Sequence, residues 1–580
     1  MKRLNNLVVE LAAAEGPQVA ISFTNPRDGW ISFAVTGDVR AGERVRLALD
    51  GPSSSPVATP LGEWREGAPR IEAMRFLPAG SHTLRLHADG RPRIAGVAVR
   101  AVAELAYCKH QYDPHIREYG PYDWAFLKRH VLDHVNTVVG GADPAHRPCV
   151  QEWKARGGRW IVECGVAGMS AETISPDEAY EAWATNPGMA DPIYDGLIVD
   201  EFFGGDNAKY PAWTEAVRRL AADFPGKRFC PYFGGHWPDR SDWLKGEGNT
   251  GPESSRQFLR AVLDAGFPVA WERYLQERHE PEIALQLMDD RLGAGVDYWQ
   301  TVFPGCARQL VVALGYMTIT ETLDIHPSVD YKVFMDLQFQ YLATRPQFDG
   351  LYGILEYTSG YADEETVRWA ARLMRHYGIE GNRDLLSPRY GFTYKPNHLW
   401  NGDFNHGLEG WSQPIWIEES TEARALDGYS HLQGRWPGTS VGNTFLWMRR
   451  RSDRDNTLGQ EIRNLTPGKL YSAKMITADW GELQSGTSTR REHGLSLSIA
   501  GAEIIPEKTF LSVVANNYSH TYGPFAGDNK FWFNYHQVVF RAKGATAHLD
   551  IADWADGMPA GPVGQELICN FVEVQPYFEG

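Results

Sequence analysis

Five acidic residues stand at or beside the ends of four short apolar runs, and their type and placement suit proton transfer or nucleophilic attack. They are Glu163, Asp200, Glu201, Glu272 and Glu356. Cleavage of a glycosidic bond needs two such carboxyl groups, one protonated to assist the leaving oxygen and one ionised to attack or to activate water. A single acid at such a position fits a helix cap or an ion pair equally well. The recurrence of the pattern favours a shared site.

The run from 194 to 205 places two of these acids side by side after Leu197, Ile198 and Val199. Side chains alternate along a regular strand, so Asp200 and Glu201 cannot both face the same side of one. We expect Glu201, the longer and later acid, to act as acid or base and Asp200 to orient its neighbours.

The second catalytic carboxylate is expected to be Glu356 rather than Glu272. Glu356 precedes the polar segment 357–361, which suits the binding of sugar hydroxyls. Glu272 stands next to Arg273, and a structural salt bridge at the rim explains it equally well. The predicted catalytic residues are therefore Glu201 with Glu356 or Glu272.

Further polar and aromatic side chains follow the same apolar runs and are expected to bind substrate. Aromatic rings suit stacking against sugars, whereas a lone histidine is more often a hydrogen-bonded rim residue. The residues with this expected role are Asp200, Lys109, His110, Glu163, Tyr232, His236, Trp237, Tyr274, Tyr316 and Tyr357.

Metal ligation is the alternative use of these side chains. His110, His236 and Glu201 are possible zinc ligands, but the sequence has no HxH or HExxH spacing to support them. The six cysteines show no CxxC spacing, so we expect free thiols and no structural zinc. We expect no metal at the site and no cofactor in catalysis.

The elements that carry these residues alternate between strand and helix over residues 104–380. The expected strands are 104–110, 136–141, 159–166, 194–203, 228–233, 268–274, 309–317 and 351–357. Helical periodicity lies between them at 124–135, 212–223, 255–265, 281–292, 329–342 and 364–377. This rhythm predicts a (β/α)8 TIM barrel of about 250 residues, with the acids at its C-terminal mouth. Residues 297–303 are an alternative strand.

Both flanks of this region have the short alternating runs and turn residues of β-sandwiches. Residues 1–103 are expected to form an N-terminal β-sandwich, and residues 398–580 a C-terminal β-sandwich of jelly-roll type. Residues 381–397, rich in Pro, Gly and Tyr, are expected to be a linker.

The composition restricts the partners. A net charge of −16 argues against nucleic acid, and no apolar run is long enough for a membrane span. The 20 Trp, 25 Tyr and 25 Phe supply many flat rings for sugar binding. Glu10 interrupts the first apolar run too early for a signal peptide. The sequence leaves two localisations open: secreted or periplasmic if a leader was trimmed, and otherwise cytoplasmic. The oligomeric state also stays open.

The segment Asn401-Gly402-Asp403-Phe404, with Gly410-Trp411 after it, resembles the first strand of jelly-roll carbohydrate-binding modules. A barrel joined to such a module is similar to multidomain glycoside hydrolases of bacteria. The resemblance implies a polysaccharide or oligosaccharide substrate and allows a structural calcium in the C-terminal module.

Residues 195–201 are also similar to the fourth-strand motif of family 18 chitinases, but Ile198 replaces an acid of that motif. The mechanism of that family is therefore not carried over to this chain.

Three functions fit these observations. The first is hydrolysis of O-glycosidic bonds by two carboxylates. The second is a polysaccharide lyase or transglycosylase on the same scaffold, in which Lys109 would neutralise a uronic carboxylate. The third is a glycan-binding protein whose barrel is not catalytic.

Overall fold

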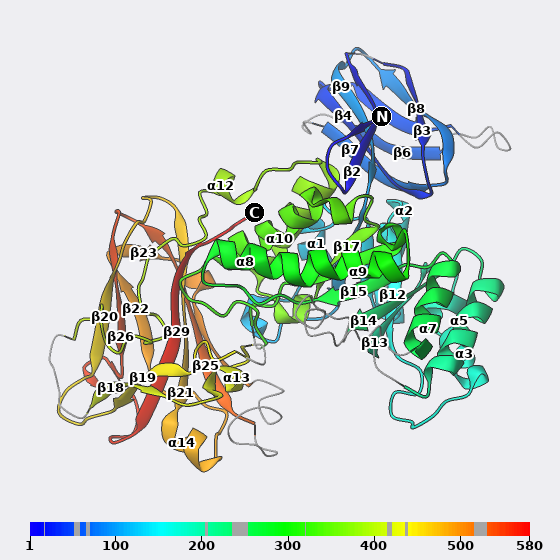
Figure 1. Cartoon of the computed structure of the whole chain (residues 1–580). Helices are drawn as coiled ribbons and strands as arrows, with labels where there is room; N and C mark the ends of the chain where they lie inside the picture. The colour runs from blue at the N-terminus through cyan, green and yellow to red at the C-terminus, as the bar shows by residue number, and fades with distance from the viewer. Residues whose placement is uncertain are drawn as a thin grey trace.

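The protein consists of a closed parallel β-barrel between two antiparallel β-sandwiches (Figure 1). The computed structural model describes residues 1–16, 18–50, 59–64, 70–203, 207–234, 253–319, 321–413, 420–435, 439–515 and 530–580. The fold class predicted from the sequence is confirmed.

The N-terminal sandwich is built from two sheets, in the orders β1-β2-β9-β4-β7 and β3-β8-β5-β6. Its strands are β1 (Lys2–Arg3), β2 (Val8–Glu15), β3 (Ala20–Asn25), β4 (Gly29–Asp38), β5 (Arg44–Leu49), β6 (Thr59–Trp64), β7 (Arg70–Leu77), β8 (Gly80–Asp89) and β9 (Arg93–Val102). Alternate side chains of both sheets, such as Phe33 and Leu84, form its core.

The barrel strands follow one another in sequence order around the closed sheet and are all parallel. They are β10 (Glu104–His110), β11 (Thr137–Gly140), β12 (Arg159–Gly165), β13 (Gly196–Phe203), β14 (Arg228–Gly234), β15 (Val269–Arg273), β16 (Leu310–Gly315) and β17 (Gly353–Tyr357). Every strand predicted in this region is present, with its ends within two residues of the expected ones.

Helices cover the outside of the barrel. They are α1 (Trp124–His130), α2 (Arg147–Ala155), α3 (Pro176–Ala184), α4 (Pro187–Ala190), α5 (Tyr210–Asp223), α7 (Glu253–Asp264), α8 (Pro281–Met288), α9 (Ala294–Val302), α10 (Tyr331–Thr344), α11 (Glu364–Leu373) and α12 (Ser387–Tyr390). Residues 297–303, the alternative strand, lie mostly within α9, which a π-helical turn joins to α8. Trp299 of α9 packs edge-on against Trp271 of β15, so the apolar residues face the barrel.

The barrel strands bury side chains on both faces, as parallel strands must. The inward set is Ala106, Cys108, Val139, Ile161, Ile198, Cys230, Tyr232, Ala270, Val311, Ala313 and Leu355. The outward set, which includes Val199 and Trp271, packs under the helices. Each fully buried Val, Leu, Ile or Phe contributes about 1.5–3 kcal/mol. Because the two sets alternate, each position near the end of a strand points its side chain either into the lumen or towards the helices.

A buried ion cluster closes the N-terminal end of the barrel. The Glu104 carboxylate lies 2.5 Å from Arg228 and 3.5 Å from Arg159, and the Trp30 indole of the N-terminal sandwich donates to it at 3.4 Å. Burial alone would raise the pKa of Glu104, but the two guanidinium groups outweigh it and hold that pKa below its usual value. This end of the barrel is therefore charged, paired and tied to the first sandwich.

The C-terminal sandwich packs one sheet, β18-β19-β29-β21-β25-β23, against a second, β20-β26-β22. Its elements are β18 (Thr421–Ala425), α13 (Tyr429–Leu432), β19 (Thr444–Arg449), β20 (Thr457–Ile462), β21 (Leu470–Asp479), α14 (Trp480–Ser485), β22 (Ser496–Ala500), β23 (Ala502–Ile504), β24 (Phe510–Ala515), β25 (Trp532–Ala542), β26 (Ala547–Ala552), β27 (Trp554–Ala555), β28 (Met558–Pro559) and β29 (Glu566–Pro576).

Residues 381–397, predicted as a linker, pack on the barrel. Leu386 and Phe392 are buried, and the Tyr390 ring lies 5.5 Å from that of Trp369. The segment includes α12 and lies between the barrel and the last sandwich in Figure 1.

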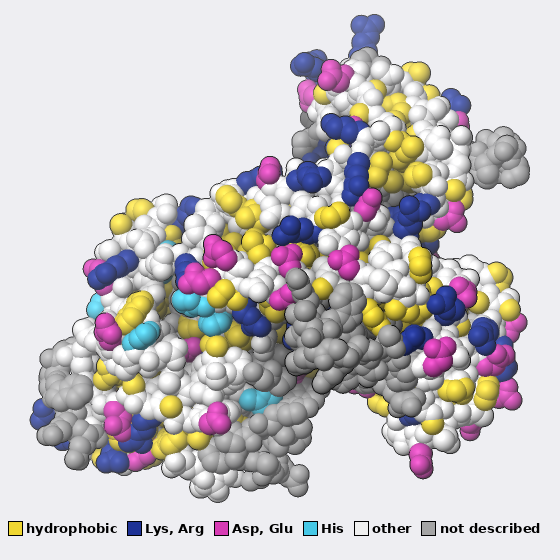
Figure 2. Space-filling model, viewed as in Figure 1, with side chains coloured by type: hydrophobic (Ala, Val, Ile, Leu, Met, Phe, Trp, Pro, Cys, Tyr) yellow, Lys and Arg dark blue, Asp and Glu magenta, His cyan; other side chains and the backbone are white. Residues whose placement is uncertain are grey.

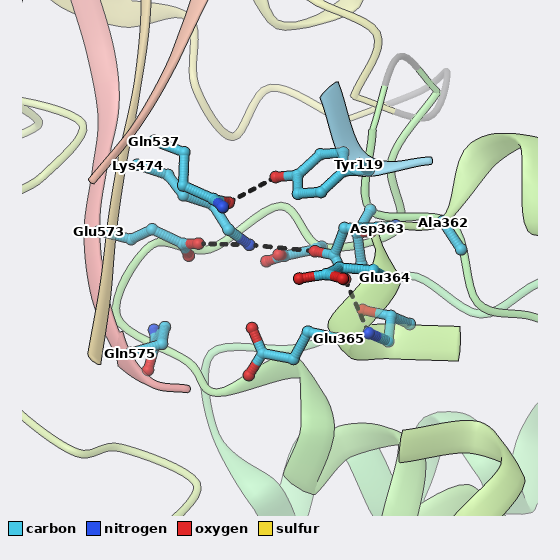
Figure 3. A network of polar contacts seen from close by, with 12 residues as sticks. Tyr119, Ala362, Asp363, Glu364, Glu365, Lys474, Gln537, Glu573 and Gln575 are labelled. Atoms are coloured by element: carbon cyan, nitrogen blue, oxygen red, sulfur yellow. Dashed lines mark hydrogen bonds and ion pairs between the residues drawn. The ribbon is translucent and has the colours of Figure 1, made fainter. Parts of the chain in front are cut away.

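The interface between barrel and C-terminal sandwich is polar and buried (Figure 3). Lys474 of β21 lies 3.4 Å from Asp363, at the start of α11, and 3.1 Å from Glu573 of β29. Near this cluster, Tyr119 donates a 2.6 Å hydrogen bond to Gln537 of β25. These charged and polar groups can be buried only because they pair with one another. Their pairing holds the barrel and the C-terminal sandwich in one relative orientation.

Candidate active site

The fourth barrel strand, β13, is irregular at the point where its two acids lie. Its pairing with β14 shifts between Val199 and Phe202, and Glu201 has a φ of 73°. Val199 and Phe202 both face the outer layer, with two residues between them instead of one. Asp200 and Glu201 therefore both lie off the outer face, contrary to the regular alternation that we expected.

Three acids occupy inward positions at the mouth. Glu163 lies two residues after inward-facing Ile161, Asp200 two after Ile198 and Glu272 two after Ala270. The charges of Glu163 and Glu201 both act on Asp200, and the charge of Asp200 acts on Glu272. The barrel thus brings acids from β12, β13 and β15 into one electrostatic cluster.

Burial changes the protonation of two of these acids. It raises the pKa of Asp200 to about 6, and the negative charges of Glu163 and Glu201 add to this effect. It also raises the pKa of Glu272 to about 7, although the Tyr274 hydroxyl donates a 2.8 Å hydrogen bond to the Glu272 carboxylate and opposes the rise. Near neutral pH Asp200 is mostly ionised, whereas Glu272 is protonated in about half of the molecules.

Glu163 has a fixed partner. The Lys109 ammonium at the end of β10 lies 2.9 Å from its carboxylate and 5.1 Å from the centre of the Tyr112 ring. Burial lowers the pKa of Lys109, but the charge of Glu163 outweighs it and the net pKa lies above its usual value. Lys109 therefore supplies a positive charge beside the acid cluster.

Tyrosine rings line the same end of the lumen. The rings of Tyr274 and Tyr357 stack at 5.5 Å with an angle of 14°, and Tyr232 meets Tyr357 edge-on at 5.7 Å. Tyr232 is fully buried, and its hydroxyl lies 3.4 Å from the Cys108 sulfur. Tyr232 forms the floor of the site, and the half-buried pair above it forms a wall.

Glu356, the preferred second carboxylate, lies on the other side of the barrel wall. Its β17 neighbours Leu355 and Tyr357 belong to the inner layer and Ile354 to the outer one, so alternation turns Glu356 outward under the helices. Its side chain is 2% exposed, and burial raises its pKa well above the usual value. This position does not bring Glu356 together with Glu201.

His110 and Tyr316 also lie away from the acid cluster. The His110 ring packs against Trp124, His146 and Trp160 in the outer layer, and burial lowers its pKa to about 4. Tyr316 is buried, and its hydroxyl donates to the Cys108 carbonyl at 2.8 Å. Both side chains support the end of β10 rather than line the mouth.

The polar segment after Glu356 is also structural. Thr358 and Ser359 are buried, and the Ser359 hydroxyl donates to the Lys109 carbonyl at 2.9 Å. This bond ties the end of β17 to the end of β10. The two other predicted binding residues, His236 and Trp237, lie outside the described residues.

Sequence reasoning missed three residues at the closure of the barrel. Cys108 is the inward residue of β10 at the level of the mouth, while Tyr112 and Tyr361 follow β10 and β17. A Cβ on Gly360 would lie 2.2 Å from the Tyr112 ring, so only glycine permits this approach. The signal was present in the sequence, because the first and last strands of a barrel are neighbours and their loops must meet.

The ranges that the structure describes show neither a metal cluster nor a membrane-spanning helix. In those ranges no group of three or more His, Cys, Asp and Glu side chains has metal-binding geometry. Within the same ranges, no helix has both the length and the apolar character of a transmembrane span. All six cysteines are free thiols.

Comparisons with known proteins give the following similarities. Neither protein-family models nor curated protein sequences match this chain. Among solved structures, a cycloisomaltooligosaccharide glucanotransferase from Paenibacillus sp. matches 98% of this chain and 72% of its own, with 10% identity and a TM-score of 0.32. A β-glucuronidase from Bacteroides uniformis matches 97% and 80%, with 8% identity and a TM-score of 0.30.

A β-galacturonidase from Eisenbergiella tayi matches 65% of this chain and 99% of its own, with 9% identity and a TM-score of 0.30. The similar structures thus include carbohydrate-active enzymes, as the three-part resemblance implied. At such low TM-scores the likeness carries no argument about activity, which has to come from the site itself.

Proposed function

We propose that this protein hydrolyses O-glycosidic bonds of an oligosaccharide or polysaccharide, with Glu272 as general acid and Asp200 as the ionised carboxylate. The supporting observation is the pair itself: two inward acids at one barrel mouth whose pKa values burial raises to about 7 and about 6. Near neutral pH the carboxyl with the higher pKa can give a proton while the other is ionised, which assigns the acid and base roles. This pair replaces our first choice of Glu201 with Glu356.

The surrounding groups support these roles. The Tyr274 hydroxyl orients the Glu272 carboxyl, and the stacked ring of Tyr357 gives an apolar wall on which a sugar ring can lie. Lys109 and Glu163, already paired, provide a donor and an acceptor for hydroxyl groups. In this proposal Glu201, exposed at the bulge, binds substrate rather than taking part in proton transfer.

The test is product release from a panel of neutral and acidic polysaccharides by the wild type, Asp200→Asn, Glu272→Gln and the control Glu356→Gln. Loss of an acid–base group lowers the rate by about 10²–10⁴-fold, so both site variants should lose kcat while Glu356→Gln keeps it. New reducing ends count the bonds that are cut, and near-ultraviolet absorbance shows whether the other end of each cut is unsaturated, as a lyase would leave it.

Four results would contradict the proposal. Equal activity of Glu272→Gln and the wild type would show that Glu272 is not the general acid. Loss of activity in Glu356→Gln alone would instead support the pair of Glu201 and Glu356. Near-ultraviolet absorbance that rises in step with the new reducing ends would show a lyase, because elimination makes one unsaturated end and one reducing end at each cut. Transfer of a glycosyl group to added sugar without release to water would show a transglycosylase.

A further inference from the structure

A second cleft lies where the loop after β10 meets the C-terminal sandwich. It has a volume of about 420 Å³, within the range of ligand sites. Its barrel wall consists of residues from Asp113 to Arg117, and its sandwich wall of the end of β24 and the start of β25, together with Arg490. The cleft thus exists only because the two modules are joined.

The cleft carries excess positive charge in an acidic protein. Arg117, Arg490 and Lys530 line it, against the single carboxylate of Asp113. Within the described ranges no carboxylate lies at ion-pair distance from these three cations. On the face of the molecule drawn in Figure 2, positive and negative side chains are interspersed. Cations in a recess that lack a carboxylate partner suit an anionic ligand.

An aromatic ring adds a stacking surface to this charge. Trp532 of β25 is half-buried in the cleft, and the Arg490 guanidinium lies 5.4 Å from its ring centre. Burial lowers the pKa of His115, so its ring is neutral at pH 7. An indole beside guanidinium and ammonium groups can hold the apolar face of a sugar ring and its anionic substituent together.

A continuous set of contacts joins this cleft to the acid cluster. Lys109, paired with Glu163, lies over the Tyr112 ring, and the Tyr112 hydroxyl lies 3.4 Å from the His115 ring nitrogen. The interface of Figure 3 fixes the two walls, since Tyr119 bonds to Gln537 and packs edge-on against Phe510 at 5.1 Å. A preformed cleft needs no reorganisation to bind.

We propose that this cleft binds an anionic saccharide, a uronate or a sulfated sugar, as an extension of the barrel mouth onto the C-terminal sandwich. The inference rests on the proposed function for its link to catalysis, but the binding itself does not. The saccharide chain would run from the acid cluster past Tyr112 and His115 to Arg490 and Trp532.

The experiment is isothermal titration of the full chain with three probes of matched length: tetragalacturonate, a sulfated κ-carrageenan tetrasaccharide and neutral β-1,4-galactotetraose. The variants are Arg490→Gln, Arg490→Gln with Lys530→Gln, and Trp532→Ala. The matched control is Arg463→Gln, because Arg463 is an exposed arginine of the same sandwich that pairs with Glu461 and does not line the cleft.

One anionic probe is expected to bind at least tenfold more tightly than the neutral one, and the anion that binds identifies the substituent. Arg490→Gln and the double variant should weaken this binding by about tenfold or more, and Arg463→Gln by less than twofold. Higher salt should weaken it as well. Arg490 is exposed, so its variant tests the cleft even if Trp532→Ala misfolds.

The inference is overturned if neither anionic probe binds, if the neutral probe binds equally well, or if the charge variants bind like the wild type. Its failure can be distinguished from that of the proposed function. Binding of an anionic probe without any hydrolysis would support the cleft and contradict the hydrolase. Hydrolysis by a protein that binds neither anionic probe would support the hydrolase and contradict the cleft.

Discussion

Burial at the barrel mouth disfavours the charged forms of Asp200 and Glu272 to a similar degree. Both side chains lose water, and negative neighbours add to the effect: Glu163 and Glu201 act on Asp200, and Asp200 and Glu201 act on Glu272. A glutamic acid has the higher pKa to begin with, so similar rises leave Glu272 protonated in about half of the molecules near neutral pH and Asp200 mostly ionised. Both rises come from position, because each acid is an ordinary side chain in the unfolded chain.

The activity should depend on pH as a bell-shaped curve. Asp200 must be ionised, so activity rises through its pKa of about 6, and Glu272 must be protonated, so activity falls above its pKa of about 7. The expected optimum of kcat/KM lies between these values. Initial rates from pH 4 to 9 check this, and a curve that stays flat up to pH 9 would exclude Glu272 as the acid.

Removal of the Tyr274 hydroxyl should move the alkaline limb of the pH–activity profile. Tyr274 donates to the Glu272 carboxylate and stabilises its charged form, so Tyr274→Phe raises the pKa of Glu272 further. The alkaline limb of the pH profile should shift upward while the acid limb stays in place. The pH profile of the variant is the measurement, and a downward shift would contradict the hydrogen-bond assignment. Tyr316→Phe is the control, because the Tyr316 hydroxyl donates to a backbone carbonyl and not to an acid.

Within each strand, the alternation of side chains decides which acids face the barrel lumen and so come together. The inner and outer layers alternate along β15 and β17, so Glu272 faces the lumen and Glu356 the helices, although both end apolar runs of similar composition. In β13 the bulge interrupts that alternation and keeps both acids at the mouth. Direction, rather than residue type, separates the site acids from the structural one.

Glu356 should affect stability rather than activity. Its folded-state pKa lies well above its unfolded value, so the folded state holds the extra proton and stability falls as pH rises from the unfolded pKa towards the folded one. The slope approaches about 1.4 kcal/mol per pH unit. Glu356→Gln should remove this loss. Urea unfolding at pH 5 and pH 8 checks it, and an equal pH dependence in both proteins would contradict it.

The interface drawn in Figure 3 holds the barrel and the C-terminal sandwich together. Lys474 is the cation between Asp363 and Glu573, and all three are buried. Desolvating the three groups costs free energy that only their pairing offsets. The interface also sets the two walls of the anionic-sugar cleft, so fold stability and the second binding site depend on the same contacts.

Lys474→Met should therefore destabilise the full chain by about 3–5 kcal/mol, because it leaves two buried carboxylates without their cation. Lys508→Met is the matched control: its pair with Glu364 is partly exposed, and its loss should cost about 1 kcal/mol or less. Denaturant unfolding measures both. Equal small effects would show that the buried pairing is not what joins the modules.

The sequence by itself determined the barrel, its strands and the two sandwiches, because periodicity and turn residues are local signals. It also identified Asp200, Glu272 and Glu163 as acids at strand ends. Only the tertiary structure decided which of the acids face one lumen. An extra residue in β13 reverses the direction of a side chain, and so does one step of alternation in β17. Neither feature can be predicted from the residue composition. The cleft at Trp532 likewise needed two modules, far apart in the chain, to be brought together.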